Sequence, residues 1–170
     1  DGLAQELHKN SGLFFKIKYY PEKSTGIAAL RSSQLAIVSL DLLAEIAKKQ
    51  KIEILLATLP AQSGRPEEKY YLMSSKNADE QAKGDFIYFS KNYSPDFIRN
   101  FILQEGWMQK HAIQTTAQVL PTLKKLAQNH TGGYVLLDSF EYASFKKLTF
   151  DWAQNLATIY ESPALPSAPL

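Results

Sequence analysis

The sequence alternates between segments of strand character and segments of helix character along most of its length. Runs rich in aliphatic, β-branched and aromatic residues cover residues 13–20, 35–40, 52–59, 70–74, 85–90, 112–115, 134–138 and 156–161. Helix-like runs lie between them, and the clearest follow Ser24, Asp41, Ser94, Thr116 and Asp138. Strands that alternate with helices usually pair in parallel, so the pattern predicts an α/β fold with mainly parallel sheets and flanking helices.

The clearest interruption of this alternation is the segment 60–68. Pro60, Ser63, Gly64 and Pro66 fall within nine residues there, which is typical of a loop or linker. We therefore expect two lobes: residues 1–74 together with 156–170 form the first, and residues 75–155 form the second. The chain would cross between two sheets at least twice.

The charge balance argues against a nucleic-acid partner. Nineteen Lys and Arg residues face seventeen Asp and Glu residues, which leaves a net charge of only +2. The chain has no cysteine, so it offers neither a thiolate metal site nor a cysteine nucleophile. No apolar run reaches the roughly 18 residues of a membrane span.

The residues most often used in catalysis form no readable constellation. His8, His111 and His130 are far apart and none has a metal-binding spacing. The motifs of α/β-hydrolases, zinc proteases and P-loop proteins do not occur. We therefore expect no metal, no cofactor and no covalent catalysis, and a binding protein rather than an enzyme.

Small polar residues repeatedly follow a strand and precede a helix. Backbone N–H groups at helix N-termini, with a hydroxyl beside them, favour anions such as phosphate or carboxylate. The strand ends of a doubly wound sheet open onto one crevice, so several such sites would converge there. The alternative is that these residues simply cap helices, and for Asp138 the two roles are equally favoured and compatible. The candidates at these strand ends are Ser24, Ser39, Asn92, Ser94, Thr116 and Asp138.

Some tyrosines also lie where strands meet loops. Tyr20, Tyr93 and one of Tyr70 and Tyr71 occupy such positions. A tyrosine there can line a pocket with its ring and donate its hydroxyl, although core or rim packing is as good an interpretation for each one alone.

Several short motifs resemble those of a known family. Residues 27–39 (IAALRSSQLAIVS), 70–77 (YYLMSSKN) and 78–84, and the later stretches 119–138 and 160–169, follow one another as in type 2 periplasmic binding proteins. The likeness is to the phosphate/phosphite/phosphonate substrate-binding group of ABC transporters. The phosphate turn of that group would correspond to Ser90–Ser94, which lacks the usual glycine.

The resemblance implies a two-lobed clamp that binds a small anionic or zwitterionic ligand in the cleft between its lobes. Carried over by position, Tyr20 and Ser24 match the first ligand loop and Ser39 the second, and Tyr71, or else Tyr70, matches the hinge tyrosine. The remaining matches are Asn92 and Ser94 in the anion turn, Thr115 or Thr116 in the next loop, and Asp138 beyond it. The resemblance further implies an ABC permease as partner, a monomer, and a periplasmic or lipid-anchored location with the signal peptide removed.

Other functions share this fold and stay open. One is a LysR-type effector-binding regulatory domain, and another is the periplasmic sensor domain of a membrane receptor. Because the sequence opens as if inside a helix and closes on a proline-rich stretch, we expect a fragment of a longer protein or a trimmed mature chain.

Overall fold

The structure is a computed structural model that describes residues 2–33, 35–49, 51–55, 57–59, 64–76, 86–103, 105–129 and 133–167. The chain divides into two compact units, Asp1–Ala36 and Ile37–Leu170.

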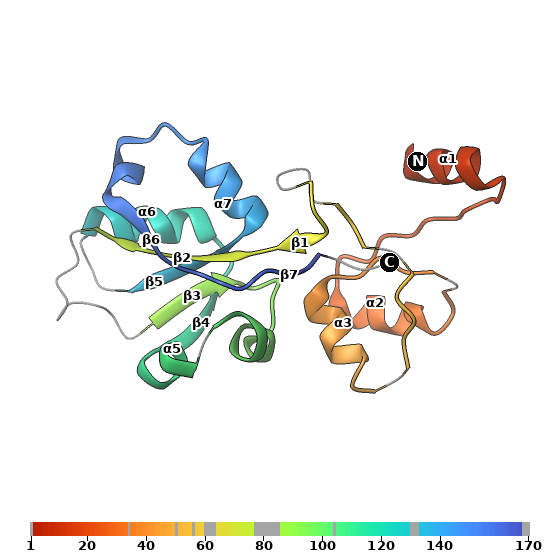
Figure 1. Cartoon of the computed structure of the whole chain (residues 1–170), viewed down its shortest axis with the longest axis horizontal. Helices are drawn as coiled ribbons and strands as arrows, with labels where there is room; N and C mark the ends of the chain where they lie inside the picture. The colour runs from red at the N-terminus through yellow and green to blue at the C-terminus, as the bar shows by residue number, and fades with distance from the viewer. Residues whose placement is uncertain are drawn as a thin grey trace. The chain divides into compact units, whose positions relative to one another are not determined.

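The elements follow one another as a mixture of short helices and strands (Figure 1). The helices are α1 (Gly2–Ser11), α2 (Lys23–Leu30), α3 (Leu40–Ile46), α4 (Pro95–Phe97), α5 (Glu105–Lys110), α6 (Val119–Asn129) and α7 (Ser139–Lys146), with a π-helical turn η2 (Ile98–Ile102) and a 3-10 helix η3 (Asp151–Asn155). The strands are β1 (Glu67–Glu68), β2 (Tyr70–Ser75), β3 (Phe86–Ser90), β4 (Ala112–Thr116), β5 (Tyr134–Asp138), β6 (Leu156–Glu161) and β7 (Leu165–Pro166). Within the described ranges, no helix has the length and apolar character needed to cross a membrane.

The second unit is built on one five-stranded sheet with the order β4-β3-β5-β2-β6. Strand β3 pairs in parallel with both β4 and β5, whereas β2 pairs antiparallel with both β5 and β6. The α/β fold class is therefore confirmed, and the sheet is mixed because β2 runs against its neighbours. Strands β1 and β7 form a separate antiparallel pair.

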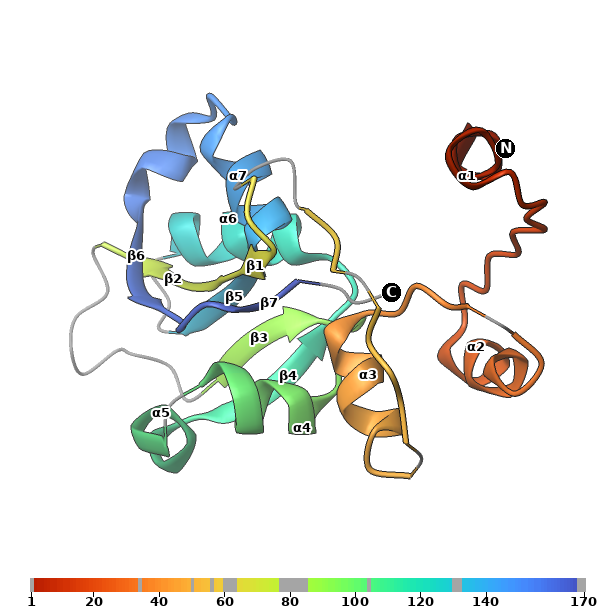
Figure 2. The same cartoon turned by 45° about the vertical axis from the view of Figure 1, so that its right-hand side comes forward.

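Alternate residues of the strands supply two hydrophobic clusters, one on each face of the sheet. On one face, Leu72, Phe89 and Leu136 pack with residues of α4 and η2. On the other face, Val135 and Leu137 pack against α6, α7 and η3. Figures 1 and 2 show α6 and α7 on one side of this sheet and α4 and α5 on the other. The sheet is thus covered by helices on both faces, as the alternating sequence predicts.

Five of the expected strands are confirmed as β2 to β6. The strands expected at 13–20, 35–40 and 52–59 are wrong for the residues described there, which belong to no strand apart from an isolated bridge at Ala57. A strand is stable only when a neighbour satisfies its backbone groups and covers its side chains. In these segments the large apolar side chains are exposed to solvent: Phe14 is 91% exposed and Ile54 is 58% exposed.

The expected division into two lobes stays a prediction. Strands β2 and β6, which we expected in the first lobe, both pair within the sheet that also contains β3, β4 and β5. Residues 60–63 of the expected linker, and the segment 78–84 of the family resemblance, lie outside the described residues.

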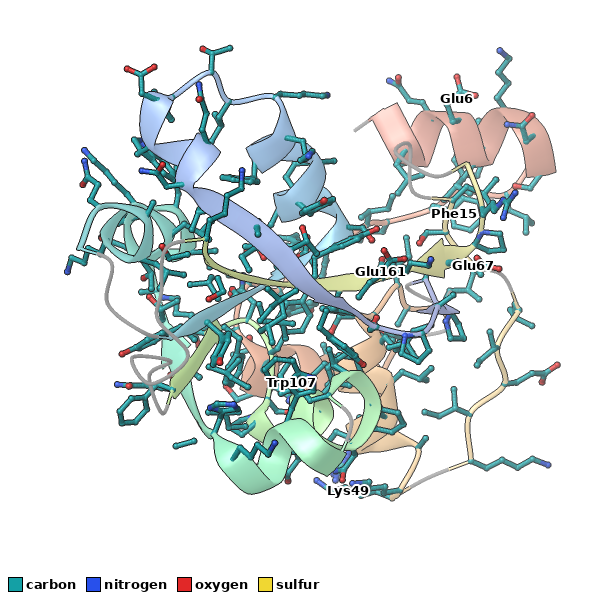
Figure 3. All side chains as sticks on the ribbon, turned by 60° about the vertical axis from the view of Figure 1, so that its left-hand side comes forward. Glu6, Phe15, Lys49, Glu67, Trp107 and Glu161 are labelled. Carbon is teal, nitrogen blue, oxygen red and sulfur yellow. The ribbon has the colours of Figure 1, made fainter. Side chains whose placement is uncertain are left out.

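Two segments leave the sheet together and continue as the β1–β7 pair. The Tyr70 N–H donates to Ser162 Oγ at 2.9 Å, and the Ser162 N–H donates to the Tyr70 carbonyl at 2.9 Å. Ser139 Oγ adds two hydrogen bonds to the Lys69 backbone, each 2.9 Å long. Glu161, at the end of β6, and Glu67, in β1, mark this region in Figure 3. Hydrogen bonds that the hydroxyls of Ser162 and Ser139 make with the backbone therefore fix where the two segments leave the sheet.

The first unit has no comparable core. Neither α1 nor α2 contains a buried residue. Helix α1 is followed by Gly12 with φ of +72°, a backbone conformation that favours glycine. His8 stacks on Phe14 with ring centroids 4.4 Å apart. This contact joins α1 to the segment that follows it.

Candidate functional site at the carboxyl edge of the sheet

The carboxyl ends of three parallel strands meet at one edge of the sheet. Ser90, the last residue of β3, lies opposite Thr116, the last residue of β4. The Lys91 N–H continues this pairing by donating to the Thr116 carbonyl at 3.0 Å. Strand β5 pairs in parallel with β3 and ends at Asp138. Polar residues that follow these strands are therefore brought together, which is where α/β sheets place ligand contacts.

Ser94 caps α4, as the sequence predicts. Its backbone is extended, Pro95 is the first helical residue, and the Phe97 N–H donates to Ser94 Oγ at 3.2 Å. The Ser94 hydroxyl in turn donates to Asp41 Oδ1 at 2.5 Å. Both functions of this hydroxyl, donor and acceptor, are thus used within the protein.

Ser39 reaches the same neighbourhood through α3. Ser39 Oγ accepts from the Leu42 N–H at 3.3 Å and caps this helix, whose first turn contains Asp41. Leu40 and Ala44 pack against the cluster under the sheet, so the helix is held in place by apolar contacts. The hydrogen bond between Asp41 and Ser94 then joins the N-terminus of α3 to that of α4.

Asp138 caps α7 in a complete capping box. Its Oδ1 accepts from the Glu141 N–H at 2.7 Å, and Glu141 Oε2 accepts from the Asp138 N–H at 3.1 Å. The other carboxylate oxygen, Oδ2, accepts from the Tyr93 hydroxyl at 2.9 Å. Asp138 therefore links α7 to the turn that precedes α4, and its capping role is confirmed.

Burial controls the protonation of the groups around Asp138. Burial raises the pKa of both Tyr70 and Tyr93 far above the ordinary value, so both hydroxyls stay protonated. The two rings meet edge to face, with centroids 5.6 Å apart. Burial, reinforced by the nearby Asp138 carboxylate, raises the pKa of Glu141 to about 7. Glu141 can therefore change its charge near neutral pH.

The two candidate hinge tyrosines lie on opposite faces of the sheet. Tyr70 is buried in the cluster that contains Phe97 and contacts Tyr93. Tyr71 instead stacks on Tyr142 of α7, with centroids 3.9 Å apart and planes 11° apart. Of the two, Tyr70 is the one beside the Asp138 network.

The remaining predicted residues are less closely connected to this network. Asn92 is exposed, and its backbone N–H donates to Ser90 Oγ at 3.4 Å. Thr116 lies three residues before the start of α6. Its Oγ1 accepts from the Gln118 N–H at 3.2 Å and lies 3.2 Å from Thr122 Oγ1. Thr116 thus stabilises the turn into α6 from a position before the helix cap.

Tyr20 and Ser24 belong to the other unit of the chain. Tyr20 is exposed, and its Cβ lies 3.7 Å from where a Cβ on Gly26 would lie. Ser24 lies inside the first turn of α2, whose N-cap is Glu22. The expectation that Ser24 opens this helix is therefore wrong: the N-cap residue is Glu22, two residues earlier in the chain.

Sequence reasoning left Asp41 and Glu141 out of the candidate set, and it named Tyr93 only as a tyrosine that could line a pocket. The spacing Asp138-Ser139-Phe140-Glu141 is that of a capping box and could have identified Glu141. Tyr93 is visible as a tyrosine at a strand end. Asp41 carries no local signal, because its partner Ser94 lies 53 residues away.

This edge of the sheet offers hydroxyl donors and carboxylate acceptors. Ser94, Tyr93 and Thr116 provide hydroxyls, and Asp41, Asp138 and Glu141 provide carboxyl groups. Among the residues that the structure describes, no three potential metal-binding side chains gather at one place. A small polar molecule can bind to this set only by replacing hydrogen bonds that these groups make within the protein.

Comparison with known proteins gives matches at the level of structure. No family model matches the sequence, and no curated protein matches it significantly. A binding-protein component of an ABC phosphonate transporter from Pseudomonas aeruginosa matches with a TM-score of 0.62 at 15% identity, over 98% of this chain and 60% of that one. The chain thus spans about three-fifths of the length of that protein.

Two further structures extend this likeness. An amino-acid ABC transporter substrate-binding protein from Streptococcus pneumoniae, bound to L-arginine, matches with a TM-score of 0.53 at 12% identity, over 99% of this chain and 67% of that one. The periplasmic domain of BvgS from Bordetella pertussis matches with a TM-score of 0.58 at 12% identity, over 95% of this chain and 30% of that one. With its helix-flanked sheet and these neighbours, the chain has the fold of type 2 periplasmic binding proteins, also called Venus flytrap domains.

Proposed function

We propose that this chain is the solute-binding component of an ABC uptake system and binds a small anionic or zwitterionic ligand, such as a phosphonate or phosphate. Its partner is the membrane permease of that system, and it acts as a monomer in the periplasm or on a lipid anchor. The role is binding without catalysis. The proposed ligand residues are Ser39, Asn92, Ser94, Thr116 and Asp138 at the sheet edge, with Tyr71, or else Tyr70, at the hinge and Tyr20 and Ser24 in the first unit.

The observation that carries this proposal is the convergence of hydroxyl groups at the carboxyl ends of β3, β4 and β5. Ser94 follows β3, Thr116 is the last residue of β4, and Asp138 is the last residue of β5. Hydroxyl donors at this edge suit phosphonate, phosphate or carboxylate oxygens. The nearby Asp138 carboxylate suits an amino group, which is why a zwitterion is included. The likeness to binding proteins for a phosphonate transporter and for arginine supports a ligand of this class.

Calorimetric titration of the chain with inorganic phosphate, methylphosphonate and L-arginine tests the proposal. We expect saturable binding of at least one of them, and about tenfold weaker binding in Ser94→Ala, because each 1.4 kcal/mol corresponds to a factor of ten. Ser144→Ala is the matched control, since it removes an exposed hydroxyl from α7. If Ser94→Ala and Asp138→Asn both bind as tightly as the parent, these residues only cap helices and the ligand site is elsewhere.

A second candidate function is favoured by the likeness to the periplasmic domain of BvgS. In this alternative the chain is part of a sensor domain in a membrane receptor, and ligand binding is signalled within the same polypeptide. The sequence of the full gene product separates the two roles, because a membrane-spanning helix beyond residue 170 favours the receptor. The ligand experiment is the same for both.

A further inference from the structure

The hydroxyl of Ser94 is already committed to a partner. A serine hydroxyl has a single proton to donate, and Ser94 donates it to Asp41 Oδ1 at 2.5 Å. The acceptor side of the same oxygen takes the Phe97 N–H at 3.2 Å. A ligand that receives a hydrogen bond from Ser94 must therefore first replace the Asp41 carboxylate.

The position of Asp41 is fixed by the fold. The residue is only 4% exposed, although it carries a carboxyl group. It lies in the first turn of α3, between the cap residue Ser39 and Ala44, which packs on the core. A carboxylate held in this way is chemically similar to the anionic group that the proposed site would bind.

We propose that Asp41 is an internal competitor for the ligand, an autoinhibitory contact in which its carboxylate occupies the place of the ligand's anionic group at Ser94. This inference rests on the proposed function and adds a regulatory residue to it. Binding of an anion breaks the hydrogen bond between Asp41 and Ser94, and so releases the link between α3 and α4. In the ligand-free protein the same bond keeps the two helix ends together.

Two physical effects follow from this arrangement. Only molecules in which Ser94 is released from Asp41 can bind the anion. The apparent affinity is therefore the intrinsic affinity multiplied by the fraction of such molecules. The charge on Asp41 also repels an incoming anion at short range, where burial weakens screening by water. Removal of the charge should therefore strengthen anion binding, whereas loss of a ligand-binding or purely structural residue would weaken it.

The test is calorimetric titration of the full chain and its Asp41→Asn variant with inorganic phosphate and with methylphosphonate. Asparagine has the shape of aspartate and keeps an acceptor for Ser94, but the hydrogen bond is no longer charge-assisted. We expect Asp41→Asn to bind the better of the two anions about tenfold more tightly. Asp96→Asn is the matched control. It removes the same charge from an exposed residue that lies two positions after Ser94. We expect no change in its affinity.

The outcomes separate this inference from the proposed function. If the parent binds an anion and Asp41→Asn binds it equally or more weakly, the competitor role is wrong and the proposed function stands. If both Asp variants bind more tightly to the same extent, the effect is one of general charge and the competitor role is wrong. If neither the parent nor Asp41→Asn binds either anion, this inference is overturned together with an anion-binding function.

The fold of each variant is checked by near-ultraviolet circular dichroism and thermal unfolding. Asp41→Ser provides a second variant, since its shorter side chain removes the charge and stays compatible with the first turn of a helix. It should bind the anion more tightly as well. If neither variant folds, Asp41 is a structural residue and the competitor role is wrong.

Discussion

Two segments of this chain are both rich in strand-forming residues but differ in structure. Residues 13–20 (LFFKIKYY) and β5 (YVLLD) are both rich in aliphatic and aromatic residues. Strand β5 has partners on both sides, and Val135 is fully buried. Residues 13–20 belong to no strand, and Phe14 is 91% exposed. Strand propensity therefore expresses itself only where neighbouring strands and covering helices supply hydrogen bonds and burial.

The helix ends of the two units differ in the same sense. Helix α7 begins with a reciprocal capping box between Asp138 and Glu141. Helix α2 has Glu22 as its N-cap residue, and the Glu22 side chain makes no capping hydrogen bond. In the second unit two of the caps are also joined to another element, since Asp138 also binds Tyr93 and Ser94 also binds Asp41. Local and tertiary contacts thus support each other there.

The largest expected effect tests the difference in burial. Leu72→Ala should lower the free energy of unfolding by about 3 kcal/mol, because Leu72 is fully buried in the core of the sheet. Phe14→Ala should change it by less than about 0.5 kcal/mol, because an exposed ring loses little on truncation. Urea unfolding followed by circular dichroism measures both values. A cost for Phe14→Ala close to that for Leu72→Ala would show that residues 13–20 are packed, and would remove the comparison.

A smaller effect tests the difference in capping. Asp138→Ala removes an N-cap and leaves the Tyr93 hydroxyl without its acceptor, so we expect a loss of about 2 kcal/mol. Glu22→Ala removes no side-chain cap and should have almost no effect. The same urea experiment compares the two variants. Equal losses would mean that the cap at α7 contributes no more than the uncapped end of α2.

The smallest effect is a pH dependence that comes from Glu141. Its pKa is raised from 4.5 to about 7 in the folded protein, so the folded state binds a proton more tightly than the unfolded state. The stabilisation is fully present below pH 4.5 and is lost as the pH rises to about 7. After a discount for its partial exposure, we expect a loss of about 1 kcal/mol between pH 5 and 8.

Glu141→Gln is the variant for this test, because glutamine can still accept from the Asp138 N–H. Unfolding free energies of the parent and the variant are measured between pH 5 and 8. The difference between them should change with pH in favour of the variant at the higher values. A difference that stays constant with pH would place the Glu141 pKa near its ordinary value and would contradict this prediction.

Much of the sheet is predictable from the sequence. The strand predictions that were wrong have a physical reason. Short apolar runs such as 134–138, bounded by glycine and a polar cap, identify β5 without further information. The antiparallel direction of β2 is not visible locally, since it depends on partners far along the chain. For residues 13–20, 35–40 and 52–59 the pattern gives the propensity, but pairing requires a partner that no local pattern specifies.

The candidate site shows the same division between local and distant information. The N-cap roles of Ser39, Ser94 and Asp138 could be predicted, because each precedes a helical pattern. The bonds from Ser94 to Asp41 and from Tyr93 to Asp138 span 53 and 45 residues, so they could not be predicted from spacing. The choice between Tyr70 and Tyr71 also depended on which face of the sheet each would occupy. Tertiary structure alone supplies that answer.

The place of β2 in the sheet has a consequence for how the chain folds. Tyr70 pairs with Asp138 on one side, and Tyr71 pairs with Glu161 on the other. Both neighbours of β2 are therefore made long after it during synthesis, and the loops that close are long. Pairing over such separations raises the contact order and slows folding relative to a sheet built from sequential hairpins. The apolar strand β2 therefore has no partner until β5 has been synthesised, and it lacks its second partner until β6 has followed. This interval is when the nascent chain is most prone to aggregate.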